Sequence, residues 1–424
     1  MKIIIFNTEE KKGGAAIAAN RLMSALQKED IDVKMLVREK TSDNKNVISL
    51  SESFFTSRLN KFRFLWERFV IFFINRFSRF NLFNISIANT GINISKLPVV
   101  KDADIIHLHW VNQGFLSLKD LKKLILLGKP IIWTLHDQWA YTSICHYTSG
   151  CEKFIEHCSN CHKLKYPGKK DISHDVFVKK AELYKNQNIT LVGCSQWIAG
   201  LAKKSELCKR MNITSIPNPI DVSIYHKKDK KELRKQLGLS SEGKLVLFGS
   251  CKVTDKRKGV DYLKAACDLL LQQNKFRYDE LSIVVFGGNS DELSSIIPYK
   301  VFNLGYINNV ESIVDLYSAV DLFLVPSLED NLPNTIMESM ACGTPCVGFE
   351  IGGIPEMIDH KENGYVAKYK SAEDLAEGII WVLNNENPEV LSQKARDKVL
   401  NTYSEDKVAN QYIKLYNTVL KNEQ

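Results

Sequence analysis

The sequence has no long hydrophobic run, and no segment approaches the roughly 18 apolar residues that a membrane-spanning helix needs. At the N-terminus, residues 3–6 form a run of only four apolar residues before Asn7. That run is too short for the core of a secretory signal peptide. The ten cysteines in 424 residues do not imply disulfides in a reducing compartment. We therefore expect a cytoplasmic protein.

The overall composition is that of an ordinary globular protein, with 44% hydrophobic and 25% charged residues. It excludes a disordered chain, a collagen-like chain and a small disulfide scaffold. The net charge is +8, and residues 54–80 hold six cations against a single acid, Glu67. Because the charge is concentrated there and no nucleic-acid-binding module is recognisable, we expect no nucleic-acid partner.

Short apolar runs alternate with helical patterns in two successive series, which predicts two doubly wound α/β domains with parallel sheets. The first series has predicted strands at 2–6, 32–37, 104–108, 130–135 and 189–193, and the second at 244–249, 281–287, 321–325 and 345–349. Pro217 and Pro219 forbid a helix between the two series. We expect domains at 1–218 and 219–402, and a C-terminal helix, 403–424, that crosses back to the first domain. Ligands of such folds bind beyond the carboxyl ends of the strands, so we expect the site in a cleft between the domains.

Two carboxylates, Asp330 and Glu338, flank a predicted helix start at Pro333. Carboxylates accept hydrogen bonds from sugar and ribose hydroxyls, while helix-start amides suit phosphate or sugar oxygens. Capping of the helix by acidic residues is an equally good interpretation of this segment alone. Likewise Gly13-Gly14, after the first strand, fits either a tight turn or an anion-binding helix start.

The segment 326–338 resembles the signature of family 4 glycosyltransferases, in which two glutamates are separated by seven residues. The chain continues as that family does, through Ser339–Val347 and Gly352–Glu356. It departs from the signature at the first glutamate, where Asp330 stands beside Glu329, and either residue could reach the donor sugar. The resemblance implies a GT-B fold, two Rossmann-like domains facing across a cleft, and a retaining sugar transfer without a catalytic metal or other cofactor.

Further landmarks extend the resemblance along nearly the whole chain: Gly13-Gly14, Thr134–Asp137, Ser195–Trp197, Pro217–Asp221, Lys252 and Lys258-Gly259. The resemblance implies that Lys252 and Lys258 grip the donor diphosphate and that His136 meets the transferred sugar. It assigns catalysis to His136, Lys258, Asp330 and Glu338. The implied donor-binding set is Gly13, Gly14, Lys252, Lys258, Glu329, Asp330, Asn331, Leu332, Pro333, Asn334 and Glu338.

Four cysteines lie within seventeen residues: Cys145, Cys151, Cys158 and Cys161. Their Cys-x-x-Cys end fits one half of a structural zinc site, and the other half lacks the usual tight spacing. Both a zinc site and ordinary loop thiols are compatible with this pattern.

Residues 54–80 also predict an amphipathic helix. Phenylalanine, leucine and tryptophan residues recur at helical spacing on one face, and Arg58, Lys61, Arg68, Arg76 and Arg79 lie on an adjacent face. The pattern fits a helix at an anionic membrane surface, and it also fits a helix packed on its own domain.

Together these features predict a glycosyltransferase that moves a sugar from a nucleoside diphosphate to a glycan or lipid-linked acceptor, in bacterial surface polysaccharide biosynthesis. It would act in the cytoplasm, and at the inner face of the membrane if residues 54–80 form a lipid-binding helix and not a helix packed on its own domain. The alternatives are a nucleotide-sugar epimerase of the same architecture and a non-catalytic scaffold.

Overall fold

The computed structural model describes residues 1–185, 187–253 and 255–421. It divides into two compact units: Met1–Asn218 together with the stretch from Val408 onward, and Pro219–Lys407. Within the described ranges, none of the helices combines the length and the hydropathy that crossing a bilayer requires.

The first unit is built on a seven-stranded parallel sheet with the order β3-β2-β1-β4-β5-β6-β7. Its central strands are buried along most of their length because helices cover both faces. The strands are β1 (Lys2–Phe6), β2 (Asp32–Val37), β3 (Val47–Ser49), β4 (Ile105–Leu108), β5 (Ile131–Leu135), β6 (Ile189–Gly193) and β7 (Asn212–Ser215).

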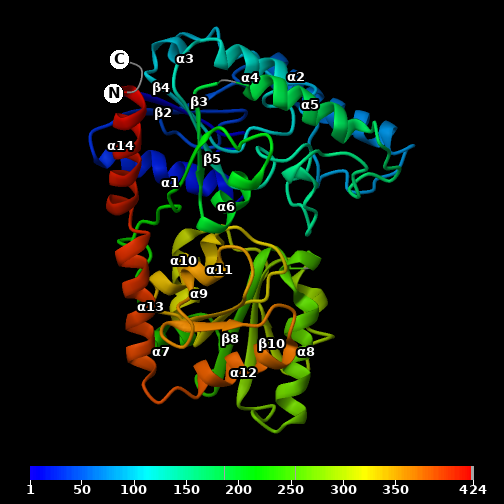
Figure 1. Ribbon diagram of the computed structural model, residues 1–424. Helices are drawn as coiled ribbons and strands as arrows, with labels where there is room; N and C mark the ends of the chain where they lie inside the picture. The colour runs from blue at the N-terminus through cyan, green and yellow to red at the C-terminus, as the bar shows by residue number, and fades with distance from the viewer. Residues whose placement is uncertain (186, 254, 422–424) are drawn as a thin grey trace. The chain divides into compact units, whose positions relative to one another are not determined.

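Alternate residues of these strands enter two separate cores. Ile4 and Phe6 of β1 pack on one side with residues of α4, α5 and α6, while Ile3 and Ile5 pack on the other with residues of α1 and α14. Helices α1 and α14 come from opposite ends of the chain (Figure 1). The helices of this unit are α1 (Gly14–Lys28), α2 (Phe54–Ile74), α3 (Pro98–Asp102), α4 (Leu118–Ile125), the 3-10 turn η1 (Lys153–Ile155), α5 (Ile172–Tyr184), α6 (Gln196–Lys204) and α14 (Glu405–Lys421).

The second unit has a six-stranded parallel sheet with the order β10-β9-β8-β11-β12-β13. Its strands are β8 (Lys244–Lys252), β9 (Leu281–Gly288), β10 (Lys300–Asn303), β11 (Leu322–Val325), β12 (Cys346–Phe349) and β13 (Gly364–Ala367). Its helices are α7 (Lys230–Gln236), η2 (Lys256–Lys258), α8 (Val260–Gln272), η3 (Ser290–Leu293), α9 (Val310–Ala319), α10 (Asn334–Ala341), α11 (Ile354–Met357), α12 (Ala372–Leu383) and α13 (Pro388–Thr402).

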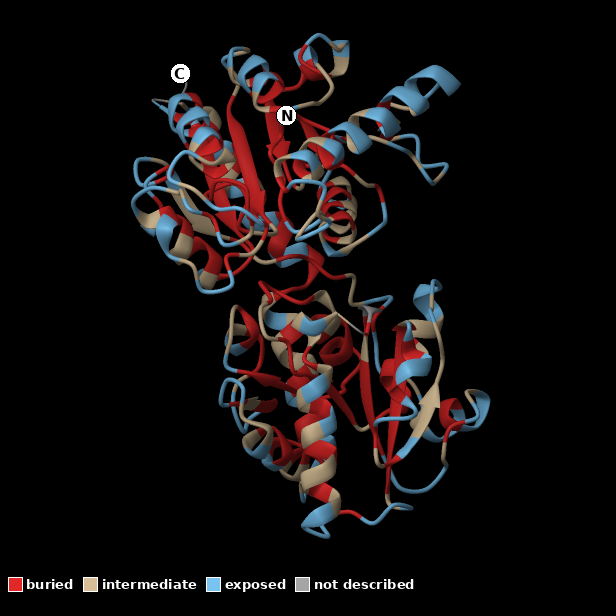
Figure 2. Cartoon of the chain, turned by 90° about the vertical axis from the view of Figure 1, so that its right-hand side faces the viewer, coloured by how far each residue is buried: buried red, intermediate tan, exposed pale blue. Residues whose placement is uncertain are grey.

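Helices α8 and α12 share one core with this sheet. Figure 2 shows the strands of both units as buried and the exposed residues mainly on helices and loops. The predicted pair of doubly wound α/β units is confirmed.

In each sheet the strand order reverses once, between β1 and β4 in the first unit and between β8 and β11 in the second. Loops that leave the carboxyl ends of neighbouring strands at such a point diverge to opposite faces and leave a crevice for a ligand. Most of the predicted site residues lie on or just beyond these loops.

Candidate functional site

Lys258 and Asp330 form an ion pair beyond the carboxyl ends of β8 and β11. Lys258 ends the short turn η2, and its Nζ lies 2.7 Å from Asp330 Oδ2. The backbone N–H of Asn331 donates to the other carboxylate oxygen at 3.0 Å. Asp330 is 9% exposed, whereas the neighbouring Glu329 is partly exposed. Of the two adjacent acids, Asp330 is therefore the one held against the predicted phosphate-binding lysine.

Two glycines allow the loops of this site to approach one another. Gly259 has a φ of +72°, and a Cβ there would lie 1.8 Å from the carbonyl oxygen of Pro326. Gly352 has a φ of +62°, and its Cβ would lie 1.7 Å from the carbonyl oxygen of Asp330. Any side chain at either position would push the loop after β11 away. These glycines fix the backbone on both sides of the Lys258–Asp330 pair.

Glu338 lies on α10, whose N-cap is Pro333. Its carboxylate is buried, and the Tyr317 hydroxyl of α9 donates to Oε2 at 3.3 Å. Burial, and then the charge of Glu338, raise the pKa of that tyrosine, so its proton stays in place for the hydrogen bond. Asn331 and Leu332, just before the helix, are also buried.

The remaining donor-side predictions have different outcomes. Lys252 ends β8 and pairs with Gly288 in the sheet, but its side chain lies outside the described part of the chain. In the first unit Gly13 precedes α1 with a φ of +90°, a conformation that favours glycine, and Gly14 is the first helical residue. The predicted glycine turn between β1 and α1 is present.

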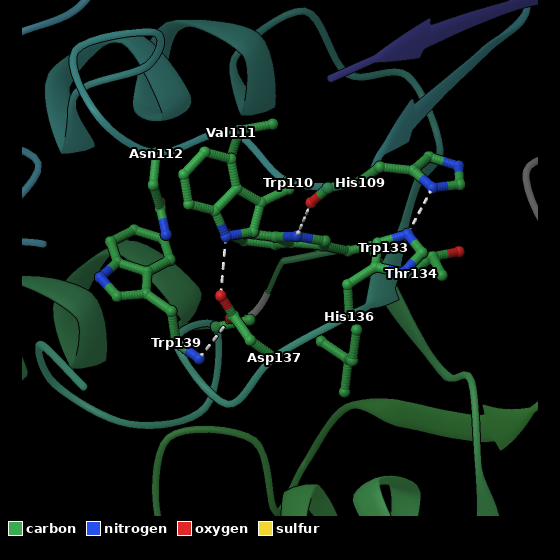
Figure 3. Close-up of a pocket in the computed structure, with 11 residues that line it drawn as sticks. His109, Trp110, Val111, Asn112, Trp133, Thr134, His136, Asp137 and Trp139 are labelled. Atoms are coloured by element: carbon green, nitrogen blue, oxygen red, sulfur yellow. Dashed lines mark hydrogen bonds between the residues drawn. The ribbon is translucent and has the colours of Figure 1, made fainter. Parts of the chain in front are cut away.

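A pocket in the first unit lies at the carboxyl ends of β4 and β5 (Figure 3). The residues that line it are His109, Trp110, Val111, Asn112, Trp133, Thr134, Leu135, His136, Asp137, Trp139 and Ala140. Predicted His136 is thus in a pocket, together with three indoles and a second histidine.

His136 belongs to a chain of three histidines, of which His107 and His109 are buried and His136 is partly exposed. Its Nε2 lies 2.8 Å from His109 Nδ1, and its Nδ1 lies 3.5 Å from Cys194 Sγ. His107 lies next to His109, with ring centroids 4.4 Å apart. The His107 ring is held by Thr134 Oγ1 and by the Tyr416 hydroxyl of α14, each at 2.8 Å.

All three histidines are neutral at physiological pH. Burial lowers the pKa of His107 to about 3 and that of His136 to about 4, and it lowers the pKa of His109 well below its usual value. A neutral imidazole has one donor and one acceptor nitrogen. In the His109–His136 contact one ring therefore donates and the other accepts.

His109 has one polar atom without a partner among the described residues: its buried Nε2. A buried polar group without a hydrogen bond costs about 1–3 kcal/mol. Because His109 lines the pocket, a hydroxyl of a ligand in the pocket could satisfy this nitrogen.

Asp137 connects the pocket to the loop that follows it. It accepts from Trp110 Nε1 at 2.7 Å and from the backbone N–H of Trp139 at 2.9 Å, and it lies 2.6 Å from His146 Nδ1. Burial alone would raise the pKa of Asp137, but His146 and the two N–H donors hold it below its usual value. The carboxylate therefore stays charged and orients the Trp110 indole.

The sequence motif identified His136 but missed His109, Trp110 and Asn112. A signal was available, because His109 and Trp110 directly follow the buried strand β4. Residues just beyond a parallel strand at a reversal of strand order are the ones expected to face a ligand.

Comparison with known proteins gives the class. Residues 12–224 match the family model described as "Glycosyltransferase Family 4", and residues 229–398 match the one described as "Glycosyl transferases group 1". Since the first match alone covers half of the chain, the chain belongs to glycosyltransferase family 4.

Individual relatives match over shorter stretches. The N-acetyl-alpha-D-glucosaminyl L-malate synthase of Bacillus anthracis is 26% identical over 50% of this chain and 55% of its own length. The N,N'-diacetylbacillosaminyl-diphospho-undecaprenol alpha-1,3-N-acetylgalactosaminyltransferase of Campylobacter jejuni is 34% identical over 34% of this chain and 39% of its own. The matched stretch thus spans about half the length of the first of these enzymes.

The solved structure of Anabaena HepE in complex with UDP-glucose matches 99% of this chain and 100% of its own, with a TM-score of 0.64 and 16% identity. At that identity the likeness concerns the fold, and the predicted GT-B fold is confirmed.

Proposed function

We propose that the protein is a retaining glycosyltransferase that moves a sugar from a nucleoside diphosphate to a hydroxyl of a glycan or lipid-linked acceptor. The observation that carries the proposal is the Lys258–Asp330 ion pair beyond the carboxyl ends of β8 and β11, followed by the buried carboxylate of Glu338 on α10, in a chain of family 4. A cation, a carboxylate held against it and a second buried carboxylate are the groups that a diphosphate, a sugar and a ribose need.

Each residue has a distinct role in this proposal. The ammonium of Lys258, with that of Lys252, stabilises the charge that develops on the diphosphate as the sugar–oxygen bond breaks. Asp330, or Glu329 beside it, accepts from donor-sugar hydroxyls, and Glu338 accepts from the ribose. Neutral His136 exchanges a hydrogen bond with the transferred sugar. The acceptor oxygen attacks the face that the diphosphate leaves, and a phosphate oxygen takes its proton, so the anomeric configuration is retained.

The names of the similar proteins support a choice of donor and acceptor to test. The Anabaena fold neighbour binds UDP-glucose, which makes uridine the first nucleotide to test. The Campylobacter relative is named for a sugar carried on diphospho-undecaprenol. A polyprenyl-diphosphate acceptor would place the protein at the cytoplasmic face of the membrane, in the synthesis of a bacterial surface polysaccharide.

The exposed face of helix α2 supports the proposal of a membrane-bound acceptor, because most of its side chains are aromatic. Phe55 is 83% exposed, and seven further large apolar side chains of the helix are exposed: Phe54, Leu59, Phe62, Leu65, Trp66, Phe69 and Phe73. Exposed apolar patches of this kind mark a binding surface. Arg58, Lys61 and Arg76 are exposed on or next to this helix, so the occupant that fits is an anionic lipid surface.

The structure of α2 differs from the sequence-based prediction in two respects. The helix ends at Ile74, short of the predicted 80, and Arg68 is buried, not on the basic face. Its guanidinium pairs with Glu67 at 2.8 Å and donates to the carbonyl oxygens of Leu82 and Ile85. Arg68 thus anchors the helix, and we exclude it from the lipid-binding set.

The test is sugar transfer by the full chain, with UDP-, GDP- and ADP-sugars and a polyprenyl-diphosphate-linked acceptor, followed by mass spectrometry. We expect one donor class to give a product whose anomeric proton coupling matches that of the donor. Glu338→Gln should fold normally and lose most transfer, whereas the exposed Glu377→Gln on α12 should behave as wild type. An inverted product would contradict retention. An epimerised sugar from donor alone, or donor binding without transfer, would contradict the transferase.

A further inference from the structure

The chain between β5 and α5 is a long irregular segment with little secondary structure of its own. From His136 to Asp171 the only helical element is the turn η1. Loops longer than about 12–15 residues without secondary structure are uncommon in compact domains, and are usually functional or disordered. This segment begins at the pocket, because His136, Asp137, Trp139 and Ala140 line it. A segment of this length needs contacts that fix its conformation.

All four cysteines of the cluster line one cavity within this segment. The cavity is bounded by Cys145, Cys151, Cys158 and Cys161, together with Phe154 and several small polar residues. Cys145 and Cys161, sixteen residues apart in the sequence, are 8% and 7% exposed. The loop therefore doubles back and brings the two ends of the sequence cluster together.

Two of the sulfurs lie close together. Cys145 Sγ lies 3.9 Å from Cys161 Sγ. In a tetrahedral zinc site with Zn–S bonds of about 2.3 Å, the edge between two sulfurs is about 3.8 Å. A disulfide would bring the sulfurs to about 2.05 Å. The pair is therefore not a disulfide, and its spacing fits two zinc ligands as well as two thiols in contact.

The Cys-x-x-Cys pair of Cys158 and Cys161 contributes both of its sulfur-bearing residues to the wall of the same cavity. In the Cys-x-x-Cys turn, Asn160 adopts a φ of +47°, which tightens the turn between the two cysteines.

A buried lysine holds the segment between the pocket and the cysteine cavity. Lys180 is 0% exposed, and its Nζ donates to the carbonyl oxygens of Trp139 at 2.5 Å and Thr142 at 3.0 Å. Trp139 lines the pocket and Thr142 lines the cysteine cavity, so this one side chain ties the two together.

We propose that Cys145, Cys151, Cys158 and Cys161 bind one structural zinc ion that fastens this segment beside the pocket. Among the described residues, no group of three or more potential ligands stands at metal-binding spacing. The metal would complete the site by drawing Cys151 and Cys158 to the edge formed by Cys145 and Cys161, since binding free energy orders the ligands of small zinc sites.

The zinc would act on the pocket through the residue that follows Cys145 in the sequence. Cys145 is followed by His146, which holds Asp137 at 2.6 Å, and Asp137 in turn orients Trp110. Fixing Cys145 therefore fixes a hydrogen-bond network that ends on a residue lining the pocket. This inference concerns the folding of the first unit and does not depend on which donor the protein uses.

The test measures metal in the full chain, purified reduced and without chelators. We expect about one zinc per chain, released together with four reactive thiols on titration with a mercurial, and a lower melting temperature after removal. Cobalt in its place should give the absorption bands of a tetrahedral thiolate site. Cys158→Ser should lose the metal, whereas Cys267→Ser, at a buried cysteine of the second unit, should keep it.

Three results would overturn the proposal. One is wild-type protein without zinc that also fails to take up cobalt. Another is a Cys145–Cys161 disulfide, seen as a mass two daltons lower before reduction. The third is full zinc content in Cys158→Ser. Where that variant fails to fold, the metal and thiol titration of the wild-type protein decides the question.

Discussion

Lys258 is the residue whose charge matters most for the proposed binding of the donor diphosphate. Its ammonium is already paired with Asp330, so a bound diphosphate would join an ion pair whose position the glycine-supported loops fix. A preorganised cation of this kind stabilises developing charge without reorganisation.

We expect Lys258→Ala to lower kcat/KM by about 5- to 150-fold, which corresponds to about 1–3 kcal/mol for a charge-assisted contact. The matched control is Lys256→Ala, since Lys256 lies in the same turn and is exposed. Steady-state kinetics of both variants check the expectation. Equal activity of the two would show that Lys258 is an ordinary surface lysine.

The buried histidines give the first unit a pH-dependent stability. Burial depresses the pKa of His107 to about 3 and of His136 to about 4, below the unfolded value of about 6.5. Below pH 6.5 the unfolded chain binds protons that the folded chain does not, so stability falls as pH drops towards the folded pKa values. Each histidine contributes a loss of about 1.4 kcal/mol per pH unit in that window.

Urea unfolding at pH 7 and pH 5 checks this expectation. Wild-type protein should be less stable at pH 5, and His107→Gln should show a smaller difference between the two pH values. His226→Gln, at an exposed histidine of the second unit, is the control and should leave the difference unchanged. An equal pH dependence for His107→Gln and wild type would show that His107 is not held neutral by burial.

At the scale of elements, the inner strands of both sheets were predictable from the sequence and the edge strands were not. The runs at 2–6, 32–37 and 189–193 match β1, β2 and β6 because strands covered on both faces are rich in buried apolar residues. The four strands not predicted, β3, β7, β10 and β13, are the outermost strands of the two sheets. Edge strands are short and partly polar, so their sequences do not stand out from loops.

The candidate site was predictable where a single segment carries it. Asp330 and Glu338 lie on one loop and helix, so the motif located both. The contact between His136 and His109 joins loops after two different strands, and nothing in either segment encodes the pairing. The ion pair of Lys258 with Asp330 joins residues 72 positions apart, which become neighbours because β8 and β11 pair in the sheet.

Helix α2 buries three polar residues and exposes most of its aromatic residues. Asn60, Glu67 and Arg68 are buried, and Glu67 accepts from the backbone N–H groups of Ile87 and Ala88 at 2.8 and 2.9 Å. This arrangement reverses the usual pattern of a surface helix. The sequence showed the periodicity, but it could not show which face turned inward.

We expect the protein to bind anionic vesicles, and binding should weaken with added salt because the Debye length shortens. Replacing Arg58, Lys61 and Arg76 by glutamine should remove about 3 kcal/mol, on the order of a hundredfold in partitioning. Co-sedimentation with vesicles measures the fraction of protein bound.

The control replaces three exposed lysines of the same unit, Lys119, Lys122 and Lys203, by glutamine. This variant has the same net charge as the α2 variant and should bind as wild type. Failure of the wild-type protein to bind at low salt, or equal loss in both variants, would show that α2 is not the lipid-binding surface.

At the scale of the whole molecule, the two units divide the chemistry. The first holds the pocket with His109 and His136, and the second holds Lys258, Asp330 and Glu338, each at the reversal of strand order in its own sheet. The C-terminal stretch belongs to the first unit, where the Tyr412 hydroxyl bonds Thr134 at 2.9 Å. The last helix therefore supports the buried network behind His136.

The central claim is that the second unit binds a nucleoside diphosphate through Lys258 and Glu338. Titration calorimetry of the full chain with UDP, GDP and ADP tests it most directly. We expect one of the three to bind wild type with a stoichiometry of about one, and to bind Lys258→Ala and Glu338→Gln more weakly by at least about fivefold each. Binding of none of the three, or equal affinity in wild type and both variants, would contradict the account.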